Sequence, residues 1–206
     1  MHFLEPFIDQ TLLKSTITRE EMAVFLDQAA PFSFASICIP SLWISFAKKR
    51  THLPICSVVA FPLGNSLNKV GEAAALIEAG VDEIDMVMHI GYAKEGAFSR
   101  IEKEVAAVAR LGTCLKVIIE SALLTSEEIL GAAKAIEAGG AQFVKTSTGF
   151  EGGATVEGVK LIRTAVSEGM GIKASGGIRD RETAEKMLEA GATRLGTSSG
   201  IKLLTT

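Results

Sequence analysis

The sequence contains little that would support a disulfide scaffold, a metal centre or a membrane anchor. Its three cysteines, Cys38, Cys56 and Cys114, are widely spaced and form no Cys-x-x-Cys pair. This spacing argues against a disulfide framework or a zinc site and favours a reducing, cytoplasmic environment. The three histidines form no ligand pattern, so we expect no metal. No apolar run approaches the roughly 18 residues of a membrane span, and the first residues lack the pattern of a signal peptide.

Charge and composition exclude further classes of function. The formal net charge is −3, which provides no general electrostatic reason to bind nucleic acid or an acidic membrane. Hydrophobic residues make up 48% of the chain and charged residues 22%, the balance of an ordinary globular protein. A length of 206 residues suits one domain with a substantial core, so we expect residues 1–206 to form a single domain.

Short apolar runs alternate with helical patterns along the whole chain. We expect strands at Ile8–Leu13, Phe34–Ile39, Pro54–Phe61, Glu83–Ile90, Cys114–Glu120, Gln142–Thr146, Ile172–Ser175 and Arg194–Thr197. We expect helices from Thr18 and then at Ser41–Arg50, Asn68–Glu78, Phe98–Leu111, Thr125–Ala138, Thr155–Glu168 and Arg181–Ala190, with a helical stub after the last strand. The tetrapeptide Ile/Leu-Glu-Ala-Gly recurs at the end of three expected helices. It predicts glycines with a left-handed backbone at Gly80, Gly139 and Gly191.

Eight such strand–helix units, at about 25 residues each, favour a compact (β/α)8 barrel, the TIM-barrel architecture. The strands are continuously apolar rather than alternating, as expected for strands buried on both faces. An open doubly wound sheet is the alternative. It would be expected to carry a glycine-rich fingerprint after the first strand, where this chain has Leu12-Leu13-Lys14-Ser15.

Three lysines, Lys116, Lys145 and Lys173, lie within apolar strands, where an ammonium group is expensive to bury. Lys145 and Lys173 belong to neighbouring strands and are expected to face one another inside the barrel, where two like charges favour one neutral amine. Such an amine can attack a carbonyl and form a Schiff base. Asp85, on the strand before Lys116, is a candidate to hold and relay protons for this group. For any one lysine, a strand-end cation or half of a buried salt bridge is the alternative, as is a structural pairing of Asp85 with Lys116.

Glycine-rich segments follow the sixth, seventh and eighth predicted strands. They contain Thr148-Gly149, Ser175-Gly176-Gly177 and Gly196-Thr197-Ser198-Ser199-Gly200. In barrels of this type the loops after the last two strands commonly bind phosphate through backbone N–H groups. These segments therefore predict a phosphate site, although glycines that only permit tight turns would produce the same pattern.

These segments together resemble the deoxyribose-phosphate aldolases, a family of class I aldolases. The resemblance runs from the first strand to the last and covers nearly the whole chain. It rests on six segments in family order: 8–13, 83–87, 115–120, 145–155, 173–179 and 196–200. It implies a (β/α)8 barrel in the cytoplasm that cleaves 2-deoxy-D-ribose 5-phosphate reversibly to acetaldehyde and D-glyceraldehyde 3-phosphate, without a metal or other cofactor, in deoxyribonucleotide catabolism.

The resemblance also implies roles for individual residues. Lys145 would form the Schiff base, Lys173 would modulate its pKa and share the proton relay, and Asp85 would be the relay carboxylate. The substrate and its phosphate would be bound by Thr148, Gly149, Gly176, Gly177, Ser198 and Ser199. Asp9, Cys38 and Lys116 are weaker candidates that we expect near the same site. The short last helix is expected to leave an apolar wall that a second copy covers in a dimer or tetramer.

Two other functions are consistent with the same residues. A phosphosugar isomerase or synthase would use the lysines as electrostatic clamps and form no covalent imine. A phosphosugar-binding protein that has lost catalysis would bind its ligand without turning it over. The intact set of Lys145, Lys173 and Asp85 argues against such a loss.

Overall fold

The computed structural model describes residues 3–205 and contains a closed barrel of eight parallel strands surrounded by helices. The strands are β1 (Ile8–Thr11), β2 (Ser36–Cys38), β3 (Ile55–Val59), β4 (Glu83–Val87), β5 (Cys114–Ile118), β6 (Phe143–Lys145), β7 (Gly171–Ser175) and β8 (Arg194–Thr197). They follow one another in chain order around the barrel, and β8 pairs in parallel with β1 to close it. The expected (β/α)8 barrel is therefore confirmed.

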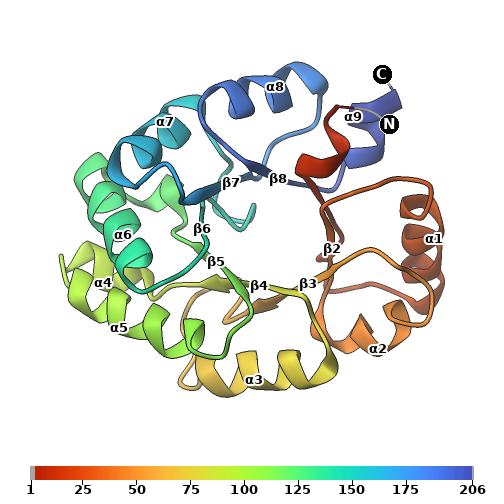
Figure 1. Cartoon of the computed structure of the whole chain (residues 1–206), viewed down its shortest axis with the longest axis horizontal. Coiled ribbons are helices and arrows are strands. Elements are labelled where there is room, and N and C mark those ends of the chain that lie inside the picture. The colour runs from red at the N-terminus through yellow and green to blue at the C-terminus, as the bar shows by residue number, and fades with distance from the viewer. Residues whose placement is uncertain (1–2, 206) are drawn as a thin grey trace.

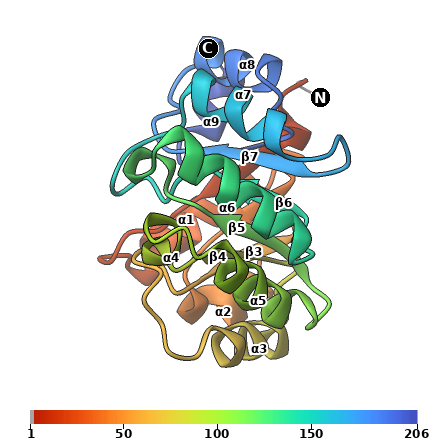
Figure 2. The same ribbon diagram turned by 90° about the vertical axis from the view of Figure 1, so that its left-hand side faces the viewer.

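The helices form a ring around the strands (Figure 1). They are α1 (Arg19–Ala29), α2 (Ile44–Ala47), α3 (Lys69–Ala79), α4 (Ile90–Lys94), α5 (Phe98–Ala109), α6 (Ser126–Ala138), α7 (Val156–Ala165), α8 (Arg181–Glu189) and α9 (Gly200–Thr205). Short 3-10 turns lie at Glu5–Phe7, Ser41–Trp43 and Ser121–Leu123. In the side view, α5 and α6 cover the outer surface of β4, β5 and β6 (Figure 2). None of the helices within residues 3–205 has both the length and the apolar character needed to cross a bilayer.

Local sequence signals explain where the helices begin. The side chains of Thr18 and Thr125 accept hydrogen bonds from the N–H groups of Glu21 and Glu128, whose carboxylates bond back to the threonine N–H groups. These reciprocal pairs are capping boxes, which satisfy two backbone donors that the helix itself leaves free. They place the starts of α1 and α6, and hence the lengths of the loops that enter them.

Some expected helix ends were wrong. Gly139 has a right-handed backbone, and the left-handed residue after α6 is Gly140 (φ 83°), because the helix continues through one more residue. Helix α7 ends at Ala165, not Glu168, because Val166 is extended there and the Arg163 guanidinium bonds the carbonyls of Ser167 and Met170. The expected helix Ser41–Arg50 is a 3-10 turn followed by the single turn of α2.

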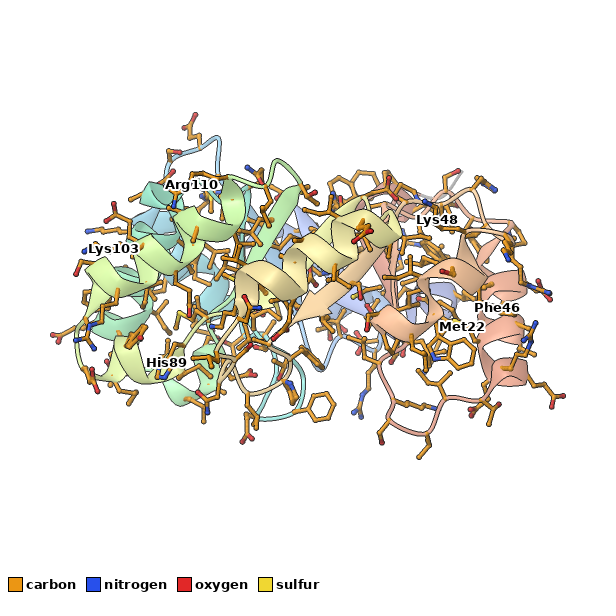
Figure 3. The ribbon with its side chains drawn as sticks, turned by 90° about the horizontal axis from the view of Figure 1, so that it is seen from below. Met22, Phe46, Lys48, His89, Lys103 and Arg110 are labelled. Atoms are coloured by element: carbon orange, nitrogen blue, oxygen red, sulfur yellow. The ribbon has the colours of Figure 1, made fainter. Side chains whose placement is uncertain are left out.

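The expected fourth strand was too long, because residues 90–94 turn into the additional helix α4. His89 lies just before this helix, at the end of the barrel opposite to Arg110, which follows α5 (Figure 3). The strand ends nearest His89 are the carboxyl ends. In (β/α)8 enzymes, the loops that follow these ends build the active site.

Candidate active site

The Asp85 carboxylate lies at the centre of the barrel and binds all three interior lysines. Its Oδ2 atom lies 2.8 Å from Lys145 Nζ and 2.7 Å from Lys173 Nζ, and its Oδ1 atom lies 3.0 Å from Lys116 Nζ. Asp85, Lys116 and Lys173 are fully buried and Lys145 is 3% exposed. Burial raises the pKa of Asp85, but the three ammonium groups outweigh burial and hold the pKa well below its usual range. Asp85 is therefore a carboxylate at neutral pH.

Strand register explains why these side chains meet. Asp85 on β4 pairs with Lys116 on β5, and Lys145 on β6 pairs with Lys173 on β7. Residues two apart in a strand share a face, so Glu83 points to the same side of β4 as Asp85. The sequence predicted that the two lysines would face one another, and the structure brings them to a single carboxylate oxygen. Asp85 also pairs with Lys116, as either reading of Asp85 allowed.

A second set of charges lies below Asp85, toward the amino ends of the strands. Asp9 Oδ2 lies 2.5 Å from Lys173 Nζ, and Asp9 Oδ1 lies 2.7 Å from the Arg194 guanidinium. Glu83 Oε2 lies 2.6 Å from Lys116 Nζ and 3.2 Å from Arg194. Sequence reasoning left open whether Asp9 faces the interior, and it does. It missed Glu83 and Arg194, although the two-residue spacing of Glu83 from Asp85 was a usable signal.

These ion pairs keep Lys173 and Lys116 protonated. Burial lowers the pKa of Lys173, but Asp85 and Asp9 outweigh burial and raise the pKa above its ordinary value. Burial likewise lowers the pKa of Lys116, and Asp85 leads the groups that raise it well above its ordinary value. Burial raises the pKa of Asp9, and Lys173, Lys116 and Arg194 together lower it. These ion pairs form one network at the base of the site, the charge lattice, which holds Asp85 in one orientation. Its members are Asp9, Glu83, Asp85, Lys116, Lys173 and Arg194.

A cavity of about 220 Å³ opens above this lattice at the carboxyl ends of the strands. Of the three interior lysines, all within the described residues, Lys145 alone lines it. The remaining wall contains the apolar residues Leu13 and Ile178 and most of the predicted phosphate-binding residues: Thr148, Gly149, Gly176, Gly177 and Ser198. Arg179 also lines the cavity. Ser199 lies beside a second hollow, with Gln10 and Ile201, and its N–H donates to Thr197 Oγ1.

Two close backbone contacts shape the glycine-rich wall. Gly176 has φ 85°, and a Cβ atom there would lie 2.8 Å from Gly153 Cα, closer than real side chains approach. The loops after β6 and β7 are further joined by hydrogen bonds from the N–H of Ala154 to the carbonyls of Ser175 and Gly176. Gly176 is therefore required by sterics as well as by its left-handed backbone.

Glu120 holds the Thr148 segment of the cavity wall in place. Its carboxylate accepts hydrogen bonds from the Thr148 N–H, at 3.2 Å, and from the Thr148 hydroxyl. Glu120 is fully buried and has a left-handed backbone (φ 53°), which is unusual for a residue other than glycine. Burial raises its pKa, and the bonds to Thr148 oppose this. The sequence placed Glu120 at a strand end but did not identify this role.

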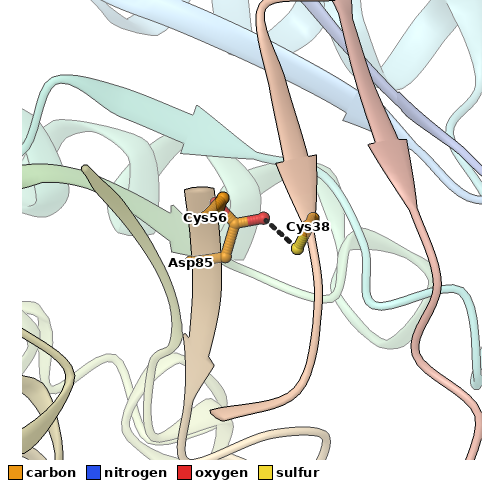
Figure 4. Close-up of side chains that lie close together, drawn as sticks. All are labelled: Cys38, Cys56 and Asp85. Atoms are coloured by element: carbon orange, nitrogen blue, oxygen red, sulfur yellow. Dashed lines mark hydrogen bonds between the residues drawn. The ribbon is translucent and has the colours of Figure 1, made fainter. Parts of the chain in front are cut away.

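Cys38 and Cys56 also converge on Asp85. Cys56 Sγ lies 3.2 Å from Asp85 Oδ1, and Cys38 Sγ lies 4.0 Å from Asp85 Oδ2 (Figure 4). The two cysteines are 18 positions apart in the sequence, so their spacing did not predict that they meet. They are neighbours because they are register partners on β2 and β3. The two sulfurs and the carboxylate could supply three metal ligands. However, Asp85 already binds three ammonium groups, whose positive charges oppose a metal cation there.

His89 lies two residues beyond the end of β4. Its buried Nδ1 atom has no hydrogen-bond partner among the described residues. The ring instead stacks on Tyr92, with ring centroids 4.2 Å apart, and the backbone N–H donates to Glu104. Its contribution to the site is therefore through packing and the backbone.

Comparisons with known proteins agree with this geometry. Residues 6–204 match the DeoC/LacD family of aldolases. The deoxyribose-phosphate aldolase of Lactococcus lactis is 44% identical over 209 residues, covering 98% of this chain and 95% of that protein. Deoxyribose-phosphate aldolase 1 of Staphylococcus aureus is 43% identical over 208 residues, covering 97% and 94%. The deoxyribose phosphate aldolase of Aeropyrum pernix, described as tetrameric, superposes with a TM-score of 0.88 at 32% identity, covering 98% of this chain and 89% of that one.

Proposed function

The chain belongs to the DeoC/LacD family of aldolases, and from that premise we propose that it is a deoxyribose-phosphate aldolase that acts through a Schiff base on Lys145. The reaction is the reversible cleavage of 2-deoxy-D-ribose 5-phosphate to acetaldehyde and D-glyceraldehyde 3-phosphate. One observation carries the choice of nucleophile. Lys145 lines the cavity, whereas Lys116 and Lys173 are sealed below it in ion pairs.

The charge lattice supports each step of this chemistry. Lys145 Nζ and Lys173 Nζ bind the same oxygen of Asp85, and of these two lysines only Lys145 lines the cavity where the substrate would enter. The Lys145 amine, in its unprotonated form, attacks C1 of the open-chain sugar, and the carbinolamine that results takes up a proton and loses water to leave an iminium ion. As the C3 hydroxyl loses its proton, the C2–C3 bond breaks and its electron pair forms an enamine.

The enamine must then gain a proton at C2, and hydrolysis of the resulting imine releases acetaldehyde and restores Lys145. Asp85 Oδ2 connects Lys145 to Lys173 through contacts of 2.8 and 2.7 Å, which makes this carboxylate and Lys173 the proton carriers nearest to the imine. Lys116 acts at a distance, because its ammonium group fixes the second oxygen of Asp85.

The glycine-rich wall suits the phosphate of the substrate. Gly176, Gly177 and Ser198 follow β7 and β8, the usual phosphate position in these barrels, and Arg179 adds a positive charge beside them. Thr148 and Gly149 close the other side of the same cavity, next to Lys145. Ser199 lines the neighbouring hollow instead, and its N–H donates to Thr197 Oγ1.

The test is reductive trapping. Borohydride treatment in the presence of 2-deoxyribose 5-phosphate, followed by peptide mass spectrometry, should give an adduct on Lys145. Lys145→Arg keeps the positive charge and should give none. An adduct on Lys173 or Lys116 would overturn the assignment of the nucleophile. Binding of the sugar phosphate without any adduct would favour an electrostatic clamp or a binding protein instead.

We also propose a cytoplasmic location and association of identical copies. The cysteines Cys38, Cys56 and Cys114 are free, which suits a reducing compartment. The Aeropyrum pernix relative is described as tetrameric, and this chain exposes the large apolar side chains of Leu42, Leu63, Leu67 and Phe150. Light scattering should give a mass above that of one chain, and a monomer at micromolar concentration would contradict the association.

A further inference from the structure

The two buried cysteines beside Asp85 meet the backbone requirement for a disulfide. Cys38 and Cys56 are register partners on the neighbouring strands β2 and β3, and both sulfurs contact Asp85; Figure 4 shows the contact of Cys38. Neighbouring strands lie about 4.8 Å apart. Disulfides join Cα atoms separated by about 4.4–6.8 Å, and the spacing of neighbouring strands falls within this range. The two sulfurs and the Asp85 carboxylate all lie within 4.8 Å of one another.

We propose that Cys38 and Cys56 form a reversible disulfide when the protein meets peroxide, and that this bond inactivates the site by withdrawing both sulfurs from Asp85. The first half of this proposal concerns thiol chemistry alone and is independent of the proposed aldol cleavage. The second half rests on the proposed function, because it is read as a loss of that activity.

The bond forms in two balanced steps. The sulfur of Cys38 attacks one peroxide oxygen, the O–O bond breaks, and the products are a sulfenic acid and water. The sulfur of Cys56 then attacks the sulfenic sulfur, the S–S bond forms, and the hydroxyl leaves as a second water. The two thiols lose two electrons and two protons in total, and one hydrogen peroxide is reduced to two waters.

The surroundings of the two sulfurs favour this order of attack. The pKa of Cys38 is lowered, chiefly by a hydrogen bond from Cys56. Burial, in contrast, raises the pKa of Cys56 well above its usual value. Cys38 is therefore the better nucleophile of the pair, and Cys56 is the resolving thiol. Both are fully buried, so the oxidant must be as small as peroxide; Lys145, which lines the cavity, contacts the same Asp85 carboxylate as the two sulfurs.

Formation of the disulfide would change the environment of the catalytic carboxylate. Cys56 Sγ now contacts Asp85 Oδ1 at 3.2 Å and accepts from Lys116 Nζ at 3.4 Å. A disulfide draws the sulfurs together to about 2.05 Å, and the Cys56 sulfur must turn away from both partners. Asp85 orients Lys145 and Lys173, and a displacement of about 1 Å in such a group costs on the order of a hundredfold in rate.

Cys114 provides a matched control. It is partly exposed and lies at the start of β5, where it pairs with Glu83 at the amino ends of the strands. We expect Cys114→Ser to retain both the basal activity and the sensitivity to peroxide of the native protein. Cys56→Ser removes the resolving thiol and should give no cross-link.

The experiment treats the reduced native protein with hydrogen peroxide, blocks remaining thiols and identifies cross-linked peptides by mass spectrometry without reduction. We expect a Cys38–Cys56 cross-link, a fall in aldolase activity of at least about tenfold in proportion to it, and recovery with dithiothreitol. Treated Cys56→Ser should keep most of its own untreated activity.

Three results would overturn the proposal. The first is a loss of activity without this cross-link, the second is full activity with the cross-link in place, and the third is reversible inactivation of Cys56→Ser equal to that of the native protein. Failure of the proposed function would look different, because the reduced protein would then show no aldolase activity and no Lys145 adduct while the cross-link could still be detected.

Discussion

Lys145 and Lys173 are register partners on neighbouring strands, and their ammonium groups bind one and the same atom, Oδ2 of Asp85. The two lysines are not equivalent. Lys173 is fully buried and has a second carboxylate, Asp9, at 2.5 Å, whereas Lys145 lines the cavity. Lys145 therefore has fewer anionic partners than Lys173, and it is the lysine that a molecule in the cavity can reach. The strand register brings both lysines to one carboxylate, and burial and the ion pair with Asp9 distinguish Lys173 from Lys145.

Replacing Lys173 by methionine should separate imine formation from structure. The variant loses the like charge beside Lys145 and one proton carrier, so we expect kcat to fall by about two to four orders of magnitude. Borohydride trapping on Lys145 should be slower by a comparable factor. Lys173→Arg retains the charge and should recover part of the trapping rate. A Lys173→Met variant that is folded by circular dichroism and traps at the native rate would contradict the role of Lys173.

The stability of the protein should fall in acid because of Asp85 and Asp9. The pKa of each carboxyl is lower in the folded protein than in the unfolded chain, whose value is near 3.9. Their contributions are therefore complete above about pH 5 and are lost as the pH falls through 4, by up to about 1.4 kcal/mol per pH unit for each group. Lys116 and Lys173 have raised pKa values, so their contributions remain complete below about pH 10.

Urea unfolding measured between pH 3 and pH 8 checks this expectation. Asp9→Asn should show a shallower loss of unfolding free energy in acid than the native protein, because one of the two carboxyls is gone. Asp85→Asn leaves three buried ammonium groups without their shared partner. It should cost about 3–5 kcal/mol at pH 7, the range found when one partner of a buried ion pair is removed. Equal acid slopes for Asp9→Asn and the native protein would refute the assignment.

Glu120 should act on substrate binding through Thr148. Glu120→Ala leaves the Thr148 N–H without its acceptor, which costs about 1–3 kcal/mol in unfolding free energy and loosens one wall of the cavity. We expect a raised KM with a smaller change in kcat. Glu120→Gln keeps an acceptor oxygen and should lie close to the native values. Equal effects of the two substitutions on KM would show that Thr148 does not depend on this bond.

Much of the fold was predictable because its signals are local. Apolar runs, capping boxes and helix-ending glycines each act over a few residues, and eight repeats of one unit leave few alternatives to a closed barrel. The errors occurred where a distant contact decides the outcome. Arg163 bonds carbonyls beyond the end of α7, and no helical periodicity signals that helix end.

The site was predictable to the extent that the chemistry is unusual in sequence. A lysine in an apolar strand stands out, and so Lys116, Lys145 and Lys173 were all identified. Arg194 and Glu83 did not stand out, because charged residues at strand starts are usually solvated, and here closure of β8 on β1 brings Arg194 to Asp9. Cys38 and Cys56 became neighbours only through strand register, which sequence spacing does not report.

Gly176 provides the sharpest test of where the phosphate binds. A methyl group at this position would meet Gly153 at 2.8 Å and would also strain a backbone with φ 85°. Gly177 has a similar backbone (φ 78°), but no atom lies within 4 Å of the position that a methyl group would occupy. Gly177→Ala is therefore the matched control, since it introduces the backbone strain without the steric clash.

We expect Gly176→Ala to lower kcat/KM for 2-deoxyribose 5-phosphate by at least about tenfold more than Gly177→Ala does, because the loops after β6 and β7 must separate to accept the methyl group. Turnover of unphosphorylated 2-deoxyribose should fall much less, since the imine proposed on Lys145 needs no phosphate. Steady-state kinetics with both sugars measure the two losses. Equal losses for the two sugars would show that the Gly176 loop positions the reacting carbon atoms, and would place the phosphate elsewhere.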